Sequence, residues 1–198
     1  MTQFRHQDHR DRRTIRLSGY DYGWAGTYFV TICARDRVHL FGEVKRGDMR
    51  LNQYGHIAAS QWTAVGRRRP GVILDAWVIM PNHMHGIVEV AGNWKRLGTV
   101  ALFAWRGSHR RLAHAQTLAT GKSCGTLGAV IGSFKSGTTR RINLLRGTPG
   151  VGVWQRGYYE HIVGGRDALE RVRQYLGNNP ARWSDASARH SIEKAVGP

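Results

Sequence analysis

Hydrophobic and polar residues follow two different periods along the chain, and these periods predict where strands and helices lie. Seven short stretches are rich in β-branched and aromatic residues or read as extended segments, as strands do. These stretches are 26–34, 40–44, 49–51, 72–80, 83–90, 151–155 and 158–163. Only Pro81 and Asn82 separate the fourth stretch from the fifth, so we expect those two strands to form an antiparallel hairpin.

Three longer stretches place apolar residues three or four positions apart, which is the period of an amphipathic helix. The first helix follows Asn52, a residue type that caps helices, and ends in the segment 67–70. The second begins at Thr126, and the third covers about 166–179, where Pro180 stops it. The apolar stripe of the second helix consists of Leu127, Val130, Ile131, Phe134, Ile142 and Leu145.

The order of these elements predicts an α+β fold. Strand, helix, two strands, helix and strand follow one another, which favours a central antiparallel sheet with its helices packed on one face. Residues 91–124 show no sustained period, and we interpret them as a basic insertion or long loop. We therefore expect a basic N-terminal arm at 1–19, one domain at 20–183 and a polar tail at 184–198.

The chain is strongly basic, which points to a polyanionic partner. Thirty Lys and Arg residues stand against thirteen Asp and Glu residues, a formal net charge of +17. Nucleic acid is the favoured partner and an anionic membrane surface the weaker alternative. The segment 1–19 is either a solvated leader or a basic arm that lies along phosphates. Six basic residues on the first two helices are candidate DNA contacts: Arg67, Arg68, Arg69, Lys135, Arg140 and Arg141.

The lack of a targeting signal, together with the cysteine usage, favours a cytoplasmic protein. No apolar stretch approaches the roughly 20 residues that span a bilayer, and the polar start lacks the apolar segment of a signal peptide. Cys33 and Cys124 are far apart in the sequence and form no metal-type cluster. A reduced, cytoplasmic protein associated with the nucleoid fits these features.

His83 and His85 stand at the start of the fifth strand, directly after the Pro-Asn turn. Because side chains alternate along a strand, both histidines face one side, while Met84 and Gly86 face a core on the other. Two neutral imidazoles placed in this way can share one divalent ion. The alternative is a pair of ordinary surface histidines in a chain that contains ten.

The third helix offers the second half of a catalytic site. Tyr175 and Asn179 are four residues apart and therefore neighbours on one helix face. A phenol beside a bound divalent ion can attack phosphorus, and an amide oxygen can ligate Mg²⁺ or Mn²⁺. The residue before a proline is displaced from helical angles, which makes the direction of Asn179 hard to predict. The alternative is that Tyr175 packs its ring on the core and Asn179 only caps the helix.

The segments 76–86, 153–161 and 175–180 together resemble the single-tyrosine HUH transposases, in particular the branch of REP-associated tyrosine transposases. The resemblance covers about 13–183, apart from the segment 91–124. It implies a ferredoxin-like sheet with helices, and it implies cleavage and rejoining of single-stranded or hairpin DNA through a 5′-phosphotyrosine intermediate. It also implies the roles of the site residues. The metal ligands are His83, His85 and Asn179, and the nucleophile is Tyr175. Many relatives carry Gln in place of Asn179.

Other functions remain open on the sequence alone. A domesticated, non-cleaving hairpin DNA-binding module has the same charge and the same histidines. A His-x-His-x-His nucleotide hydrolase or transferase is disfavoured because Ile87 stands where its third histidine would be. A zinc-stabilised binding domain lacks a cluster of four Cys or His ligands. The sequence does not decide between a monomer and a homodimer.

Overall fold

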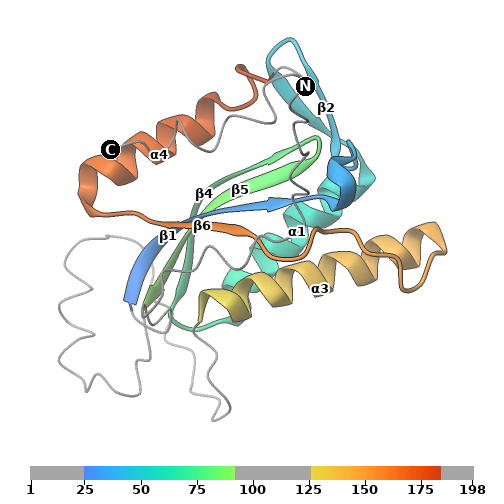
Figure 1. Ribbon diagram of the computed structural model, residues 1–198, viewed down its shortest axis with the longest axis horizontal. Coiled ribbons are helices and arrows are strands. Elements are labelled where there is room, and N and C mark those ends of the chain that lie inside the picture. The colour runs from blue at the N-terminus through green and yellow to red at the C-terminus, as the bar shows by residue number, and fades with distance from the viewer. Residues whose placement is uncertain (1–24, 92–125, 184–198) are drawn as a thin grey trace, which may run out of the picture.

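The computed structural model describes residues 25–91 and 126–183, which form an α+β fold around a four-stranded antiparallel sheet (Figure 1). The strand order is β4-β5-β1-β6. The strands are β1 (Ala25–Cys33), β4 (Val72–Met80), β5 (His83–Ala91) and β6 (Tyr159–Ile162). The predicted arm at 1–19, the tail at 184–198 and the insertion at 91–124, apart from Ala91 itself, lie outside the described residues.

The predicted helices and the predicted cap at Asn52 are confirmed. Asn52 accepts a hydrogen bond from the Gly55 N–H at the start of the first helix, and Thr126 accepts one from the Ala129 N–H at the start of the second. A small hairpin and a short 3₁₀ turn lie beside the main sheet. These elements are α1 (Gln53–Arg68), α3 (Leu127–Arg146), α4 (Gly165–Asn178), β2 (Gly42–Lys45), β3 (Asp48–Leu51) and η1 (Arg35–Arg37).

One face of the sheet packs against α1 and α3 (Figure 1) and holds the larger core. Tyr28 and Val88 point into this core from β1 and β5, as the strand alternation predicts. Trp62 of α1 meets Phe134 of α3 edge to face, with ring centroids 5.1 Å apart. Gly86 lies directly beneath Trp62, and a Cβ at this position would approach the indole ring to 2.8 Å. The glycine that follows the two histidines therefore makes room for the central aromatic residue of the core.

The other face of the sheet is covered by α4, which corrects the prediction that the helices share one face (Figure 1). Phe29 and Ile87 point to this side and pack against Val172 and Leu176 of α4. The apolar stripe of a helix predicts that it packs on the sheet but does not select a face. The face opposite the main core is consequently also packed, and His83 and His85 are buried on it.

Two further expectations differ in detail from the structure. The segment 151–155 forms no strand and contributes only an isolated bridge between Trp154 and Ala34. Leu145 is 45% exposed rather than part of the buried stripe of α3, because the last turns of this helix extend beyond the sheet (Figure 1). Within the described ranges, no helix is long and apolar enough to cross a membrane.

Candidate active site

The two histidines of β5 converge on one point beneath α4. Their Nε2 atoms lie 3.0 Å apart, and the exposed fractions of His83 and His85 are only 8% and 1%. This geometry confirms that both side chains leave the strand on the same face. It also corrects the view of them as side chains outside any core, because the α4 side of the sheet is itself buried.

Both Nδ1 atoms have oxygen partners. The Asn82 Oδ1 atom lies 2.7 Å from His83 Nδ1, and the Thr31 Oγ1 atom lies 2.7 Å from His85 Nδ1. Thr31 stands opposite His85 in the β1–β5 register, so the hydrogen bond crosses the strand pair directly. An imidazole whose Nδ1 donates a hydrogen bond presents a lone pair at Nε2, which is the arrangement that metal-binding histidines adopt.

The donor set fits a divalent ion. Two ligand atoms about 2.1 Å from an octahedral ion and at right angles to each other are about 3.0 Å apart, which matches the separation of the two Nε2 atoms. In the described part of the chain no three His, Cys, Asp or Glu residues gather in one place. The further ligands that the described residues can offer here are neutral side-chain oxygens, to which substrate oxygens or water can add, and oxygen ligands suit Mn²⁺ or Mg²⁺.

Burial keeps both imidazoles neutral. Desolvation and the nearby Arg37 guanidinium lower the pKa of His83 to about 4. Desolvation, followed by the neighbouring His83, lowers the pKa of His85 well below its usual value. Neutral imidazoles are the form that ligates a cation, so the site is in its binding-competent protonation state at pH 7.

Tyr175 and Asn179 of α4 complete the cluster. The Tyr175 hydroxyl lies 3.4 Å from His85 Nε2 and forms a hydrogen bond with the Asn179 side chain. Burial raises the pKa of Tyr175, and the bond to Asn179 offsets part of that rise. Asn179 is 8% exposed. The structure thus brings together the four residues that the sequence predicted as a site.

The backbone at the end of α4 sets where the Asn179 side chain points. The sequence made this orientation hard to predict because Pro180 follows. Asn179 keeps right-handed helical angles, with φ −60° and ψ −46°. Past Pro180, the Arg182 N–H bonds the carbonyls of both Asn178 and Asn179, which continues the chain in a further turn. The local hydrogen bonds therefore override the usual effect of proline on the preceding residue.

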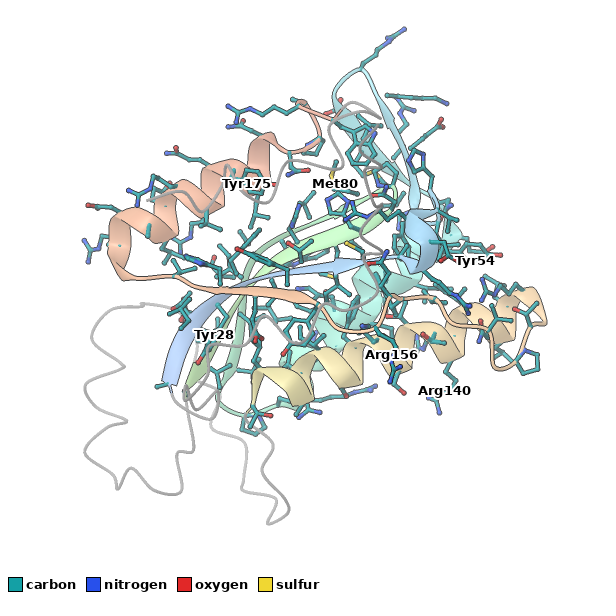
Figure 2. All side chains as sticks on the ribbon, viewed as in Figure 1. Tyr28, Tyr54, Met80, Arg140, Arg156 and Tyr175 are labelled. Atoms are coloured by element: carbon teal, nitrogen blue, oxygen red, sulfur yellow. The ribbon has the colours of Figure 1, made fainter. Side chains whose placement is uncertain are left out.

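Aromatic rings enclose the site. Phe29 stacks on His85 at a centroid distance of 5.3 Å and meets Tyr175 edge to face at 6.0 Å. On the opposite side, the Trp183 ring lies 5.7 Å from the ring of His83. Figure 2 shows Tyr175 between α4 and the sheet, in this enclosed layer. Aromatic walls lower the local dielectric and strengthen the electrostatic interactions of any charge held between them.

Comparison with known proteins adds a relative of matching length. An uncharacterized protein of Haemophilus influenzae is 35% identical to the chain over 172 residues, which cover 87% of this chain and 89% of that protein. The two chains belong to one family. No protein-family model matches the sequence.

Comparison with solved structures establishes the fold. The structure of a REP-associated tyrosine transposase bound to a REP hairpin aligns with a TM-score of 0.54 and 19% identity. The alignment covers 86% of this chain and 74% of that one. A structure from Deinococcus radiodurans aligns with a TM-score of 0.42, which is too low to support an argument. The chain has the fold of the hairpin-bound transposase, the HUH fold that the sequence resemblance implied.

The predicted DNA contacts are not gathered around the site. Arg67, Arg68 and Arg69 end α1 at the start of β4, and a strand rises about 3.3 Å per residue. The nine residues of β4 therefore place this basic cluster on the order of 25 Å from the histidines. Figure 2 shows Arg140 on the outer side of α3, across the sheet from Tyr175.

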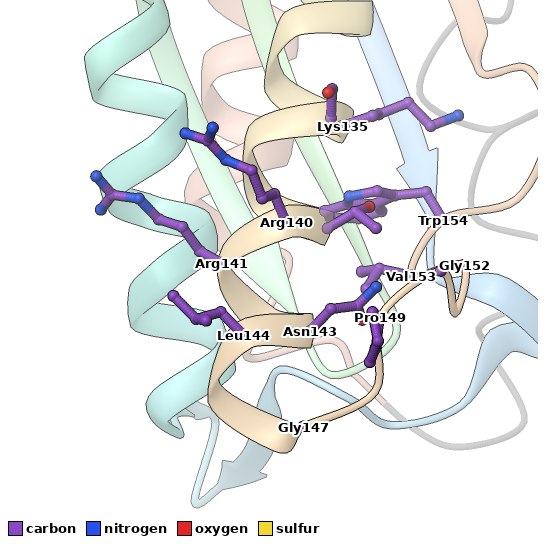
Figure 3. Close-up of a pocket in the computed structure, with 13 residues that line it drawn as sticks. Lys135, Arg140, Arg141, Asn143, Leu144, Gly147, Pro149, Gly152, Val153 and Trp154 are labelled. Atoms are coloured by element: carbon purple, nitrogen blue, oxygen red, sulfur yellow. The ribbon is translucent and has the colours of Figure 1, made fainter.

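A groove of about 1020 Å³ lies between α3 and the segment 147–154, and Arg140 and Arg141 contribute to its lining (Figure 3). Lys135 extends in the opposite direction and donates hydrogen bonds to the carbonyls of Gln155 and Gly157, at 2.5 and 2.8 Å. Lys135 therefore connects the segment before β6 to α3. This structural role differs from the DNA contact that the sequence predicted for it.

Four side chains around the histidines carried no role in the sequence analysis. The sequence places Asn82 in the turn before β5, but its hydrogen bond to His83 depends on the geometry of that turn. Arg37 influences the pKa of His83 from the turn after β1, where Asp36 and Arg37 both adopt positive φ values of 55° and 53°. Thr31 and Trp183 reach the site only through strand register and the turn after α4, which no local pattern reveals.

Two other tyrosines, Tyr158 and Tyr159, occupy packing positions near β6. Tyr158 packs against the main core, and Tyr159 packs against the α4 cluster. They pack on different clusters because adjacent residues of an extended segment point to opposite faces. Tyr28 is fully buried in the main core, and Tyr22 lies outside the described residues.

Proposed function

We propose that the chain is a metal-dependent DNA endonuclease and strand transferase of the transposase type, which cleaves and rejoins single-stranded or hairpin DNA. The observation that carries this proposal is the convergence of Tyr175 with His83 and His85, residues about ninety positions apart in the sequence, with the hydroxyl 3.4 Å from His85 Nε2. The solved transposase with the same fold is bound to a hairpin, which supports the choice of substrate.

In this proposal His83, His85 and the amide oxygen of Asn179 hold Mn²⁺ or Mg²⁺. When bound, such an ion polarises the phosphodiester and lowers the pKa of a nearby hydroxyl. The amide of Asn179 has two uses, because the same side chain is hydrogen-bonded to the Tyr175 hydroxyl.

Tyr175 is the nucleophile. Its Oη atom forms a bond to phosphorus, the bond from phosphorus to the 3′ oxygen breaks, and the phenolic proton reaches the departing 3′ oxygen through solvent. The products are a 5′-phosphotyrosine ester and a strand with a free 3′-hydroxyl. The ester conserves the bond energy, so attack by a 3′-hydroxyl on the phosphotyrosine rejoins DNA without a nucleotide cofactor.

Positive charge holds the DNA backbone. Arg37 lies beside His83 and suits a phosphate at the reacting position, while Arg140 and Arg141 line the groove on the other side of the sheet. Binding that releases counterions from phosphates weakens steeply as salt rises.

A hairpin-binding module that does not cleave is the second candidate. Burial raises the pKa of Tyr175, which leaves the phenol a poor nucleophile unless a cation is present. A binding module keeps the salt-sensitive affinity and forms no adduct.

Incubation with labelled hairpin DNA that carries single-stranded flanks, in the presence of Mn²⁺, tests the proposal on a denaturing gel. We expect a covalent adduct with the parent and none with Tyr175→Phe, whose melting temperature and DNA affinity stay close to the parent's. Tyr158→Phe and Tyr159→Phe are the matched controls and retain the adduct. Persistence of the adduct in Tyr175→Phe would show that the nucleophile is misassigned. A parent that binds the hairpin with no adduct in Mn²⁺ or Mg²⁺ favours the binding module.

A further inference from the structure

The contact between Thr31 and His85 tolerates a proton on either side, and the contact between Asn82 and His83 does not. Both are 2.7 Å long and both reach an Nδ1 atom. The Asn82 Oδ1 atom can only accept, so it fixes the proton of His83 on Nδ1. The Thr31 hydroxyl can donate or accept, so it is compatible with a proton on either nitrogen of His85.

The separation of the two Nε2 atoms makes this difference important. His83 presents a lone pair at Nε2, because its proton is held on Nδ1 by Asn82. A second lone pair 3.0 Å away, in a site nearly closed to water, is repulsive unless a proton or a cation lies between them. Without an ion, the stable arrangement therefore places the His85 proton on Nε2, from where it donates to His83. Thr31 then donates its hydroxyl hydrogen to Nδ1.

Ion binding requires the opposite arrangement at His85. Both Nε2 lone pairs then point at the cation, and the proton of His85 resides on Nδ1 with the Thr31 oxygen as acceptor. The ring stays neutral throughout. One proton leaves Nε2 for solvent, one arrives at Nδ1 from solvent, and the hydroxyl rotates about its C–O bond.

We propose that Thr31 is a positioning residue that supports both tautomers of His85 and so allows the histidine pair to change from a mutual hydrogen bond to a shared ion site. The proposal rests on the divalent ion of the proposed function. Thr31 is suited to this task by its place in the fold. It is 2% exposed and stands opposite His85 in the strand register, so water does not substitute for its hydroxyl.

Thr31→Val and Thr31→Ser separate the hydroxyl from the shape of the side chain. Valine preserves the shape and removes the hydroxyl, which leaves Nδ1 of His85 without a partner in both forms. The loss is larger in the ion-bound form, because the cation draws charge from the ring and makes its Nδ1–H the stronger donor. Serine keeps the hydroxyl. Thr138→Val is the matched control, because Thr138 is fully buried in α3 and its hydroxyl has no hydrogen-bond partner within the described ranges.

Calorimetric titration of the full chain with Mn²⁺ provides the first measurement. Loss of an outer partner of a metal-binding histidine weakens metal affinity about 10–100-fold, and we expect a change of this size for Thr31→Val. Thr31→Ser is expected to stay within a few-fold of the parent, and Thr138→Val to match it. Equal Mn²⁺ affinity in the parent and Thr31→Val overturns the inference and leaves the proposed function intact. A parent that does not bind Mn²⁺ overturns both.

Nitrogen-15 NMR of the imidazoles gives a second measurement that does not depend on the folding of Thr31→Val. In the ion-free parent we expect His83 to be protonated at Nδ1 and His85 at Nε2, with His85→Ala used for assignment. Addition of Zn²⁺ as a diamagnetic probe is expected to move the His85 proton to Nδ1. A proton on Nδ1 of His85 before any ion is added overturns the exchange of tautomers.

Discussion

The two faces of the sheet bury very different side chains. The face beneath α1 and α3 is lined by apolar and aromatic residues, with Trp62 and Phe134 at its centre. The face beneath α4 has a small apolar cluster around Phe29 and Leu176, and beside it buried polar groups. Those polar residues are Thr31, Asn82, His83, His85 and Asn179.

This difference shows how strand alternation places the residues that stabilise the fold on one face and the residues of the site on the other. Successive residues of β5 serve opposite faces, so Met84 packs in the main core while its neighbours His83 and His85 form the site. A buried polar group without a partner is unfavourable, and the site satisfies the histidine Nδ1 atoms with specific side chains. The large apolar face supplies stability that lets the smaller face hold such groups in fixed positions.

Trp62→Ala is expected to have the largest effect on stability. Truncation of a fully buried tryptophan costs about 3–5 kcal/mol, a large part of the roughly 5–15 kcal/mol that stabilises a domain. Urea unfolding followed by circular dichroism measures this loss. Trp77→Ala is the control, since Trp77 is 37% exposed, and it should lose well under half as much. Equal losses would show that the α1 and α3 face is not the main source of stability.

His85→Ala tests the other face and is expected to have an intermediate effect. The change removes the Mn²⁺ site and leaves the buried Thr31 hydroxyl without its partner, which costs about 1–3 kcal/mol. Titration with Mn²⁺ and urea unfolding measure the two effects separately. His56→Ala, at an exposed position of α1, should change stability by less than about 0.5 kcal/mol. A His85→Ala chain that fails to fold would indicate that the histidine pair is structural.

Asp75→Asn is expected to have the smallest effect, because it weakens only the attachment of α4. Arg173 donates from Nε and Nη2 to one oxygen of Asp75, at 3.0 and 2.7 Å, and so joins α4 to β4. We expect a loss of about 1 kcal/mol that shrinks at high salt. Glu170→Gln is the control, since its contact with Arg173 is 3.5 Å long and more exposed. A loss as large as that of Trp62→Ala would mean that the α4 face depends chiefly on this ion pair.

The sequence predicted the elements and half of the site because those features are local. The cap Asn52, the helix start at Thr126, the hairpin around Pro81 and the shared face of His83 and His85 each follow from residues close together in the chain. The pairing of Tyr175 with the histidines came from resemblance to a family, because no local pattern joins residues so far apart.

The remaining features depend on long-range geometry. The stripe of α4 is compatible with either face of the sheet, and only the folded chain shows that α4 lies opposite α1 and α3. Thr31 reaches His85 through the register of β1 and β5, and a shift of one residue would turn it to the other face. Trp183 reaches His83 through the turn that follows Pro180, a path set by backbone hydrogen bonds.

The two-residue turn Pro81–Asn82 limits how this chain can change during evolution. Backbone bonds hold the turn on both sides, from the Phe41 N–H to the Pro81 carbonyl and from the Ala34 N–H to the Asn82 carbonyl. Insertion or deletion of one residue between the turn and His85 would exchange the faces of β5, sending an imidazole toward Trp62 and a methionine toward Tyr175. A change of two residues would restore the faces but move His85 two positions along β1, away from Thr31, so a lineage that keeps the site has to keep the length of this short segment.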